Sequence, residues 1–562
     1  MKNFLLVVPR FARVGGFYNF PLGLAYISSS LKSKGFNVHC LNLCHTDEPL
    51  NKVLDICIKE KNIDVLGTGG MSQNWDVISS VLDAAKSVKP DIITIVGGAI
   101  VVSDPELALT TMKIDFGILG EGEATMLELA GYLCRNEDPK NIDGITYLDK
   151  DKNKVIVNRN RARINNLDEL PFPDYESFEF DQWKSLIRFS GQANILDKYD
   201  DLNYVQMLGS RSCPFSCTFC FHHMGQKYSE RSLDNIFKEI DYLVEKHKVN
   251  FFFFSDELLS ANPARLMEFA RRIKNYPING WVGSFRVTDT NVEMLKVLKD
   301  SKLVVMGYGI ENINDSILKS MNKRITKAEI ERALKAHHEV GLFCAGNIIL
   351  GDPAETKETL KTSINYWLNH PEYNLNLIFL MPIPDSKIYR LALEKKLIKD
   401  KLKHIRDGFP MVNLTAISDK EFYKFQSRIM WMKHKYQNVR EGKLIEVKKD
   451  GNYKGKKRYL VSIKCHFCYH ITEHLTLEND RSWFYTSLCD QCASTSKVKS
   501  TEVFSENKNL LKRRLNYFSL FLMSYLARFK FYRENRVAII KIFRKIKFPI
   551  SFLLGLRKKI LA

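Results

Sequence analysis

Three cysteines stand within eight residues near the middle of the chain: Cys213, Cys217 and Cys220. The stretch reads Cys-Pro-Phe-Ser-Cys-Thr-Phe-Cys, so the spacing is C-x3-C-x2-C. Thiolates are the usual ligands of iron–sulfur clusters, and one tight loop can direct three of them at the same cluster. A cluster of four irons needs four ligands, so three cysteines leave one iron open to a substrate or cofactor. The alternatives are a zinc knuckle or buried free cysteines.

Length, composition and cysteine usage narrow the class of protein. A chain of 562 residues exceeds one typical hydrophobic core, so several domains are expected. A hydrophobic content of 45% and a charged content of 26% are ordinary for a globular protein. No run of ~18 uncharged apolar residues indicates a transmembrane helix, and the short apolar run at 4–8 predicts a buried strand rather than a signal peptide. Seven of the twelve cysteines have metal-ligand spacings, which favours a reducing cytoplasm over secretion.

Residues 1–145 alternate short apolar runs, rich in β-formers, with helical patterns. Strands are expected at 4–8, 38–43, 65–67 and 92–96, and helices at 22–34 and 75–88. This alternation predicts a parallel sheet with helices on both faces, whose ligands sit at the carboxyl ends of the strands. Glycine-rich loops follow these strands, and glycine lets a backbone approach a flat or phosphate-bearing ligand closely. By themselves the loops fit a nucleotide binder, a receiver-like module, or glycines that serve only as turn residues.

A second alternation of strands and helices covers residues 186–395 and carries polar groups at its strand ends. A strand at 205–208 leads into the cysteine loop, a helix is expected at 233–246, and a strand at 251–254 ends in carboxylates. Acid groups at the carboxyl end of a barrel strand face the mouth of the barrel, and an arginine there suits a carboxylate ligand. The polar strand ends comprise Asp256, Glu257, Ser284, Arg286, Glu311 and Asn312. One such carboxylate is often a helix cap or a surface group, but several behind a three-cysteine loop favour an active site.

The cysteine loop, with Phe219 before its last cysteine, resembles the cluster motif of radical S-adenosylmethionine (SAM) enzymes, and the strands after it resemble their partial barrel. The resemblance implies that Cys213, Cys217 and Cys220 hold a [4Fe-4S] cluster. Its open iron would bind SAM, and one electron would cleave SAM to a 5′-deoxyadenosyl radical. The implied SAM contacts are Asp256 and Glu257 near the amino group, Ser284 and Arg286 near the carboxylate, Glu311 near the ribose and the strand from Gly346 to Gly351 near the adenine. Phe219 and Asn312 are further residues expected at the cofactor.

The loops of the first domain, taken in order, resemble the cobalamin-binding domain that precedes many radical SAM domains. Segments 20–28, 96–99, 104–106 and 120–125 carry this resemblance. The implied cobalamin contacts are Pro21, Gly23, Ser72, Gly97, Gly98, Gly120, Glu121, Gly122 and Glu123. The chain lacks the Asp-x-His-x-x-Gly motif of the broader cobalamin family, so the lower face of a bound cobalamin is expected to lack a protein histidine. Residues 146–185 are expected to form a linker. Within it, residues 167–175 resemble the strap that joins the two domains in that family.

Two further cysteine pairs lie in the carboxyl-terminal part, with the pattern C-x2-C-x20-C-x2-C. They are Cys465, Cys468, Cys489 and Cys492. Two such knuckles place four thiolates around one zinc ion. A structural zinc ribbon is therefore expected at 451–500, after a charged helical connector at 396–450. A second iron–sulfur cluster is the alternative, and His466 and His470 are candidate replacement ligands.

The last segment, 501–562, is strongly basic. It holds fifteen lysines and arginines against three acidic residues, which accounts for most of the net charge of +20. Two apolar blocks, 515–527 and 548–556, interleave with this charge. Basic amphipathic helices of this kind can lie on an anionic membrane surface. The other interpretations are nucleic-acid binding, which is the less favoured, and a helical extension packed on the protein's own barrel.

The sequence therefore predicts an α/β protein: a Rossmann-like cobalamin-binding domain, a radical SAM partial (β/α) barrel, a zinc ribbon and a helical tail. In the methyltransferase branch of the family, a ferredoxin or flavodoxin supplies the electron. The radical removes a hydrogen from an unactivated carbon, and methylcobalamin donates the methyl group. One alternative is a cobalamin-dependent cyclisation or rearrangement without methyl transfer. Another is a non-catalytic cobalamin or redox sensor whose ribbon binds a partner.

An RNA methylthiotransferase is disfavoured, because the amino-terminal cysteines do not resemble the cluster set of those enzymes. The expected location is the cytoplasm, with contact of the tail to the inner membrane face as an option. The sequence does not indicate the substrate.

Overall fold

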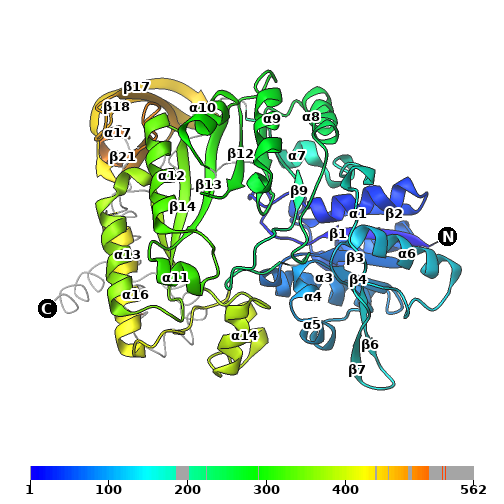
Figure 1. Ribbon diagram of the computed structural model, residues 1–562. Helices are drawn as coiled ribbons and strands as arrows, with labels where there is room; N and C mark the ends of the chain where they lie inside the picture. Colours follow the sequence, from blue (N-terminus) through cyan, green and yellow to red (C-terminus); the bar gives the residue numbers. More distant parts are fainter. Residues whose placement is uncertain are drawn as a thin grey trace, which may run out of the picture. The chain divides into compact units, whose positions relative to one another are not determined.

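The structure, a computed structural model, describes residues 2–184, 202–222, 224–288, 290–436, 439–453, 455–478 and 484–504, together with Leu522 and Leu526. The chain divides into two units (Figure 1). Unit 1 comprises residues 1–188, 202–284 and 382–409, and unit 2 comprises residues 189–201, 285–381 and 410–562. The amino-terminal domain and the cysteine loop thus belong to the same unit.

Unit 1 contains a seven-stranded sheet in the order β2-β1-β3-β4-β5-β6-β7 (Figure 1). Its strands are β1 (Asn3–Val8), β2 (Asn37–Asn42), β3 (Val65–Gly69), β4 (Ile93–Gly97), β5 (Phe116–Ile118), β6 (Ile145–Asp149) and β7 (Lys154–Val157). β1 to β5 run parallel, as the alternation of strands and helices predicts, and the four strands predicted in this domain are confirmed as β1 to β4. β6 and β7 form an antiparallel hairpin on β5. The sequence did not indicate β5, which is only three residues long.

Helices cover both faces of this sheet. Alternate residues of β1 point to opposite faces, and Leu5 and Val7 join the core that packs under α2 (Leu50–Glu60) and α3 (Trp75–Val88). α1 (Leu22–Ser33) packs against α6 (Gly122–Arg135), and Figure 1 shows both across the strands from α3. The short helices α4 (Ala99–Val102) and α5 (Pro105–Thr111) follow β4. The carboxyl ends of the strands are left for loops, as the glycine pattern predicts.

The second half of unit 1 is a smaller parallel sheet with its helices. β11 (Phe251–Phe254) pairs in parallel with β8 (Tyr204–Met207) and with β12 (Gly280–Phe285). Between them run α8 (Leu233–His247), which confirms the predicted helix, and α9 (Pro263–Ile273). The linker contains short helices at Leu167–Glu169, Glu176–Phe178 and Phe180–Lys184. Two more helices close the unit, α14 (Lys387–Glu394) and α15 (Lys401–Arg406).

Unit 2 contains a second parallel group, β13 (Leu303–Glu311), β14 (Phe343–Leu350) and β15 (Leu375–Phe379). Its helices are α10 (Val292–Asp300), α11 (Asp315–Ser320), α12 (Lys327–Val340), α13 (Lys357–Asn369) and α16 (Asp419–Tyr436). α12 shows how local sequence sets such bounds. Thr326 and Glu329 form a capping box at its start, and Gly341, with a φ of 65°, ends it.

Two small sheets and a single helical turn complete the described part of unit 2. The first is an antiparallel meander of β17 (Lys443–Tyr453), β18 (Lys456–Lys464) and β19 (Ile471–Leu477). The second has the order β16-β21-β20, with bounds Arg440–Glu441, Thr495–Lys499 and Phe484–Leu488. The turn α17 (Ser500–Val503) follows.

The basic segment at 501–562 lies outside the described residues from 505 onward, apart from Leu522 and Leu526, so its predicted amphipathic helices stay predictions. The described helices include none that is both long and apolar enough to cross a membrane.

Candidate functional site

The loop that carries Cys213, Cys217 and Cys220 is closed at its base by a short antiparallel ladder. β9 (Ser210–Arg211) pairs with β10 (Ser229–Glu230), so the two arms of the loop return to the same place. Inside the loop the backbone N–H of Cys220 donates to the carbonyl of Cys217 at 3.2 Å. Cys217 and Cys220 therefore stand on one tight turn, and Cys213 lies in the same loop, which the ladder closes at its base.

Two hydrogen bonds to backbone carbonyls hold this loop further. Ser212 is buried with a φ of 69°, and its hydroxyl donates to the carbonyl of Gly225 in the far arm. The N–H of Ile388, at the start of α14, donates to the carbonyl of Thr218 at 3.1 Å. Helix α14 therefore supports the loop next to Phe219, which is half-buried.

The donor set fits an iron–sulfur cluster chemically. Burial raises the pKa of the Cys213 thiol, and charges on Glu257, Cys217 and Cys220 raise it further. Several thiolates close together are unfavourable unless a cation neutralises them. The irons of a [4Fe-4S] cluster would supply that charge, with three protein ligands and one open position.

Asp256 follows β11 and is 3% exposed. Its carboxylate accepts the N–H of Gly209 at 3.0 Å and the hydroxyl of Ser210, both at the base of the cysteine loop. Burial raises its pKa, against the effect of these hydrogen bonds and of Arg265. The structure thus places Asp256 as a brace of the loop base.

The next carboxylate, Glu257, lies 2.8 Å through Oε2 from Nδ1 of His222, which follows the last cysteine of the loop. The side chain of His222 is 9% exposed and that of Glu257 is 26% exposed. Ser284, at the end of β12, is half-buried in the same unit. No motif in the sequence points to His222.

The glycines predicted at the cofactor stand at the carboxyl ends of β3 and β4. A Cβ atom on Gly69 would lie 2.4 Å from the carbonyl oxygen of Gly97. Gly98 has a φ of 87°, and a Cβ there would lie 2.9 Å from the carbonyl oxygen of Gly70. Only glycine permits this approach of the two strand ends. The glycines therefore place no side chains at the ends of β3 and β4, where a large flat ligand would need access.

Other predicted contacts line the same edge of the sheet. Ser72 is buried and bonds through its hydroxyl to that of Ser103 at 2.9 Å. Pro21 precedes α1, and a Cβ on the next predicted glycine, Gly23, would meet nothing within 4 Å. The same openness holds at Gly120, whose φ is 69°. This combination of a bare edge and open loops fits cobalamin.

Glu121 and Glu123, which begin the segment into α6, carry carboxylates that pair with arginines. Oε1 of Glu121 lies 3.1 Å from Nη1 of Arg211, and Oε1 of Glu123 lies 2.6 Å from Nη2 of the same guanidinium. Arg163, in the linker, donates from Nε to Oε2 of Glu121 at 3.0 Å. Gly122, which separates Glu121 from Glu123 in the sequence, packs close to Ile27. The sequence missed both arginines, which lie 42 to 90 residues away from their partners.

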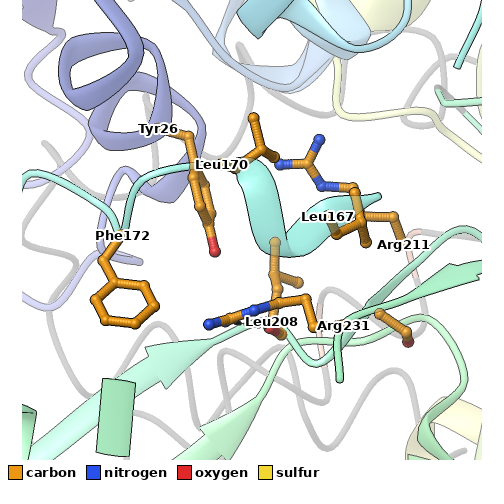
Figure 2. A pocket seen from close by; sticks show the side chains of 8 residues that line it. Tyr26, Leu167, Leu170, Phe172, Leu208, Arg211 and Arg231 are labelled. Carbon is orange, nitrogen blue, oxygen red and sulfur yellow. Dashed lines mark hydrogen bonds between the residues drawn. The ribbon is translucent and has the colours of Figure 1, made fainter. Parts of the chain in front are cut away.

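Tyr26 of α1 separates two buried arginines (Figure 2). Its ring lies 5.2 Å from the guanidinium of Arg211, and the cavity between Arg211 and Arg231 has a volume of about 10 Å³. That is room for about one water molecule. The guanidinium groups of Arg211 and Arg231 are thus buried between the amino-terminal domain and the cysteine loop, and they do not line an open pocket.

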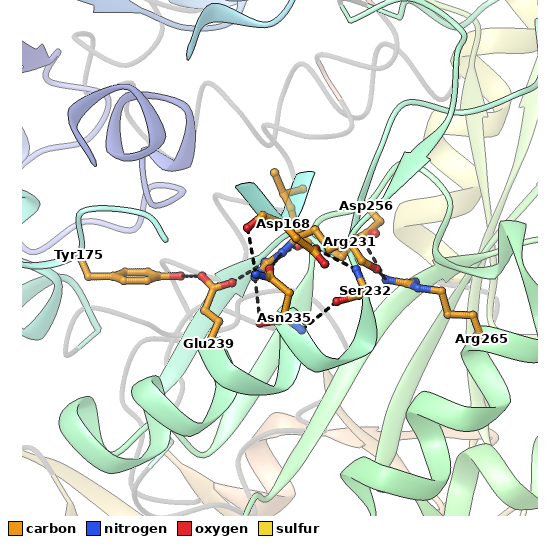
Figure 3. Close-up of polar contacts among 10 residues, drawn as sticks. Asp168, Tyr175, Arg231, Ser232, Asn235, Glu239, Asp256 and Arg265 are labelled. Carbon is orange, nitrogen blue, oxygen red and sulfur yellow. Dashed lines mark hydrogen bonds and ion pairs between the residues drawn. The ribbon is translucent and has the colours of Figure 1, made fainter. Parts of the chain in front are cut away.

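A second buried network ties the strap to α8 (Figure 3). Tyr175 donates to Oε1 of Glu239 at 2.7 Å, and Arg231 pairs with Oε2 of the same carboxylate. Arg231 also donates to the carbonyl of Leu208 at 2.9 Å, and Arg265 donates to that of Gly209 at 3.0 Å. The base of the cysteine loop is therefore held by buried charges on several sides.

Four predicted SAM contacts lie in unit 2: Arg286, Glu311, Asn312 and Gly351. Glu311 has a φ of 62° at a register shift in β13, and it pairs with Lys323 at 2.8 Å. A Cβ on Gly309 would lie 2.4 Å from the lysine nitrogen, so glycine leaves room for the pair. Arg286 donates from Nη2 to the carbonyls of Lys323 and Arg324, each at 2.6 Å.

Asn312 and Gly351 directly follow the neighbouring strands β13 and β14. Asn312 is buried, donates to the carbonyl of Ile349 at 3.1 Å and accepts the N–H of Asn314 at 3.0 Å. Gly351 has a φ of 102°, and its N–H donates to Glu355. The sequence did not single out Glu355, which is 1% exposed. Burial and the nearby Asp352 raise its pKa to about 8.

The carboxyl-terminal cysteines form a compact group in unit 2. The sulfurs of Cys465, Cys468, Cys489 and Cys492 all lie within 4.8 Å of one another, and no other such group of His, Cys, Asp or Glu ligands occurs among the described residues. The Sγ distances are 3.7 Å for Cys465–Cys492 and 3.5 Å for Cys468–Cys489. A tetrahedral zinc site with bonds of ~2.3 Å separates its sulfurs by about 3.8 Å. The four thiols therefore have the spacing of a single-ion site.

Contacts of this group fix it to the end of α12. A Cβ on Gly341 would lie 1.8 Å from the carbonyl oxygen of Gln491, so the second knuckle sits directly against that glycine. Ser494 bonds to Nδ1 of His338 at 3.3 Å. Of the two candidate replacement ligands, His470 lies 3.0 Å through Nε2 from Asp490, and the backbone N–H of His466 donates to the hydroxyl of Ser496. Cys344, outside both cysteine motifs, is buried.

Comparisons with known proteins match both halves of the expected architecture. The family model of the radical SAM superfamily matches residues 207–366, and that of the B12 binding domain matches residues 11–130. An uncharacterized methyltransferase of Pyrococcus horikoshii is 28% identical over 71% of this chain and 84% of its own. The anaerobic magnesium-protoporphyrin IX monomethyl ester cyclase of Cereibacter sphaeroides is 27% identical over 61% of this chain, which spans only 55% of that relative.

Among solved structures, the radical SAM methyltransferase TsrM of Kitasatospora setae, with cobalamin and a [4Fe-4S] cluster bound, superimposes with a TM-score of 0.57. It is 17% identical, and the match covers 70% of this chain and 76% of TsrM. At that identity the likeness concerns the fold alone. The chain thus carries a region that matches the radical SAM superfamily and, ahead of it, a region that matches the B12 binding domain.

Proposed function

We propose that this protein is a cobalamin-dependent radical SAM methyltransferase that acts on an unactivated carbon of its substrate. The observation that carries the proposal is the closed three-cysteine loop, tied in the same unit to the glycine-lined edge of the B12-binding sheet through Arg211 and Glu121. The relative in Pyrococcus horikoshii and the fold of TsrM support methyl transfer as the reaction. The nature of the substrate stays open.

The proposed cluster ligands are Cys213, Cys217 and Cys220. When bound, the cluster and SAM would supply a 5′-deoxyadenosyl radical, and the cobalamin would supply the methyl group. The proposed SAM contacts are Phe219, Glu257 and Ser284 of unit 1. The SAM contacts expected at Arg286, Glu311 and Gly351 stay predictions from the sequence. Asp256 accepts the N–H of Gly209 and the hydroxyl of Ser210, and Asn312 accepts the N–H of Asn314. These two would serve SAM by holding the strand ends that carry the other contacts.

The proposed cobalamin contacts are the backbone and small side chains at Pro21, Gly23, Ser72, Gly97, Gly98, Gly120 and Gly122. Absence of Cβ atoms at the ends of β3 and β4 lets the ligand approach the strand ends. The carboxylates of Glu121 and Glu123 face arginines, so the loop would meet the ligand with its backbone.

We propose a structural zinc ion for the four carboxyl-terminal cysteines, since their sulfur spacing fits one tetrahedral ion. The proposed partner is a low-potential electron donor, a ferredoxin or flavodoxin, in the reducing cytoplasm. That location is supported by twelve cysteines without a disulfide. Contact of the basic tail with the inner membrane surface remains a separate proposal that rests on sequence alone.

The proposal is tested on anaerobically reconstituted full-length protein with dithionite as the reductant, hydroxocobalamin, and SAM labelled at its methyl group. We expect about one bound cobalamin per chain, read from its visible spectrum, and transfer of label from SAM to the reduced cobalamin. Cys217→Ala should retain cobalamin but lose most of the transfer, whereas Cys134→Ala, outside both cysteine motifs, should behave as the wild type. Bound cobalamin that never receives the label would contradict methyl transfer and favour a cyclase. Failure to bind cobalamin would overturn the role of the first domain.

A further inference from the structure

Both arms of the cysteine loop are held by one buried carboxylate, that of Glu121. Its Oε1 lies 3.1 Å from Nη1 of Arg211, in the near arm two residues before the first cysteine. Its Oε2 accepts Nε–H of Arg163 at 3.0 Å. Arg163 in turn donates from Nη1 to the carbonyl of Met224, in the far arm. Glu121 therefore reaches the near arm directly and the far arm through one arginine.

Glu123 reinforces the near arm with a second ion pair. Its two oxygens lie 2.6 Å and 3.3 Å from Nη2 and Nη1 of Arg211. Glu121, Glu123 and Arg211 are 8%, 6% and 6% exposed. Burial alone would lower the pKa of Arg211, but Glu123 and Glu121 hold it above its ordinary value. Buried charges that satisfy one another in this way favour one geometry, because any displacement leaves a charge unpaired.

The position of these carboxylates gives the network a function. Glu121 directly follows Gly120 in the loop after β5, and Glu123 lies in the first turn of α6, at the carboxyl edge of the sheet where the glycines leave space for a ligand. A ligand that orders this loop would also order the carboxylates, and through them both arms of the cysteine loop. None of the four charged residues needs to touch the ligand for this effect.

We propose that Glu121, acting through Arg211 and Arg163, couples the cobalamin site to the cluster site. This inference rests on the proposed function, since it takes cobalamin and the cluster as the two ligands. The three side chains are positioning residues. Coupling between two binding sites is reciprocal, so a cluster on the cysteine loop must tighten cobalamin binding by the same factor by which cobalamin favours the ordered loop.

The experiment measures the dissociation constant of hydroxocobalamin for full-length protein with and without the reconstituted cluster. We expect the cluster-loaded wild type to bind at least about fivefold more tightly than the cluster-free protein, the lower end of typical coupling. In Glu121→Gln this ratio should fall to about one. Glu123→Gln, which removes charge from the near arm only, should give an intermediate ratio.

The matched control is Glu128→Gln, on the same helix as Glu123. Glu128 pairs with Arg161, in a half-exposed position. It should keep the wild-type ratio. A pure loss of stability would weaken binding in both forms of a variant and leave the ratio unchanged, so the ratio separates coupling from folding.

Each other outcome has a definite meaning. Equal affinity of the two wild-type forms would overturn the coupling while leaving the proposed function intact. A wild-type ratio in Glu121→Gln would overturn the role of Glu121. Absence of hydroxocobalamin binding in both wild-type forms would overturn the proposed function, and the coupling with it.

Discussion

Asn374 holds the metal-binding loop at Ala493 with its side-chain amide. Its Nδ2 donates to the carbonyl of Ala493 at 2.9 Å, and its Oδ1 accepts the N–H of Thr495 at 3.1 Å. Asn374 directly precedes β15 of the parallel group in unit 2. The four-cysteine loop is thus docked on the strands of the radical SAM region, and its metal should stabilise them.

Removal of the metal should loosen this docking. Cys489→Ser is expected to lower the metal content from about one ion per chain to near zero, because four ligands are needed for a closed zinc site. Amide exchange should then rise at 341–345 and 372–376, which face the loop, since metal binding and local folding are linked. Mass spectrometry of the exchanged protein measures both segments. Cys134→Ser, outside the metal site, is the control, and unchanged protection in Cys489→Ser would contradict the docking role.

Glu355 should make stability depend on pH. Its pKa is raised from 4.5 to about 8 by burial and by Asp352. The folded protein therefore holds a proton that the unfolded chain releases between these values, and the contribution to stability falls as pH rises through this window. Glu355→Gln removes the dependence. Its Tm relative to the wild type should be higher at pH 8.5 than at pH 6 by a few degrees, since ~1 kcal/mol shifts Tm by roughly 2–4 °C in a domain of 150–250 residues.

The same two-pH comparison on Glu358→Gln provides the control, because Glu358 is exposed on the following helix. If the difference in Tm between Glu355→Gln and the wild type is the same at pH 6 and pH 8.5, Glu355 is already ionised at pH 6.

The buried pair of Arg231 and Glu239 should be costly to break. Glu239→Gln leaves the guanidinium of Arg231 buried without its counter-charge, which typically costs about 3–5 kcal/mol. Denaturant unfolding measures the loss. The pair of Lys246 and Glu176 is half-exposed, so Glu176→Gln should cost no more than about 1 kcal/mol. Similar losses in the two variants would mean that Glu239 is not paired as described.

Two glycines of the first domain should respond with opposite signs. Gly69→Ala places a Cβ 2.4 Å from the carbonyl of Gly97 and forces the ends of β3 and β4 apart. It should destabilise the protein and weaken hydroxocobalamin binding by about tenfold or more, equivalent to ~1.4 kcal/mol. Gly131→Ala, inside α6, meets only the end of the flexible Arg135 side chain. It should stabilise by up to about 1 kcal/mol. Thermal melts and cobalamin titrations of both variants check the contrast.

The local sequence was sufficient for the regular elements and for the four-cysteine group. β1 to β4 and α3 coincide with the predicted runs because their apolar patterns are strong and local. The metal group could be predicted because C-x2-C spacing is itself a geometric constraint. The three-residue strand β5 left no such pattern.

The environment of single side chains could not be predicted in the same way. Glu121 and Glu123 were expected at the cofactor, yet their carboxylates face Arg211, which lies about 90 residues along the chain. Asp256 was expected at SAM, and its oxygens are bonded to Gly209 and Ser210. Such partners are set by the packing of distant segments, which no spacing within one segment reveals.

The most direct test of the account is the formation of 5′-deoxyadenosine from SAM by the reduced, cluster-loaded and cobalamin-loaded protein, quantified by chromatography. The account predicts 5′-deoxyadenosine in the wild type and its loss in Cys217→Ala, with the fold and the bound cobalamin of that variant retained. A folded wild-type protein that holds iron and cobalamin but yields no 5′-deoxyadenosine above the level of Cys217→Ala would contradict radical SAM chemistry, and a sensor role would then replace it.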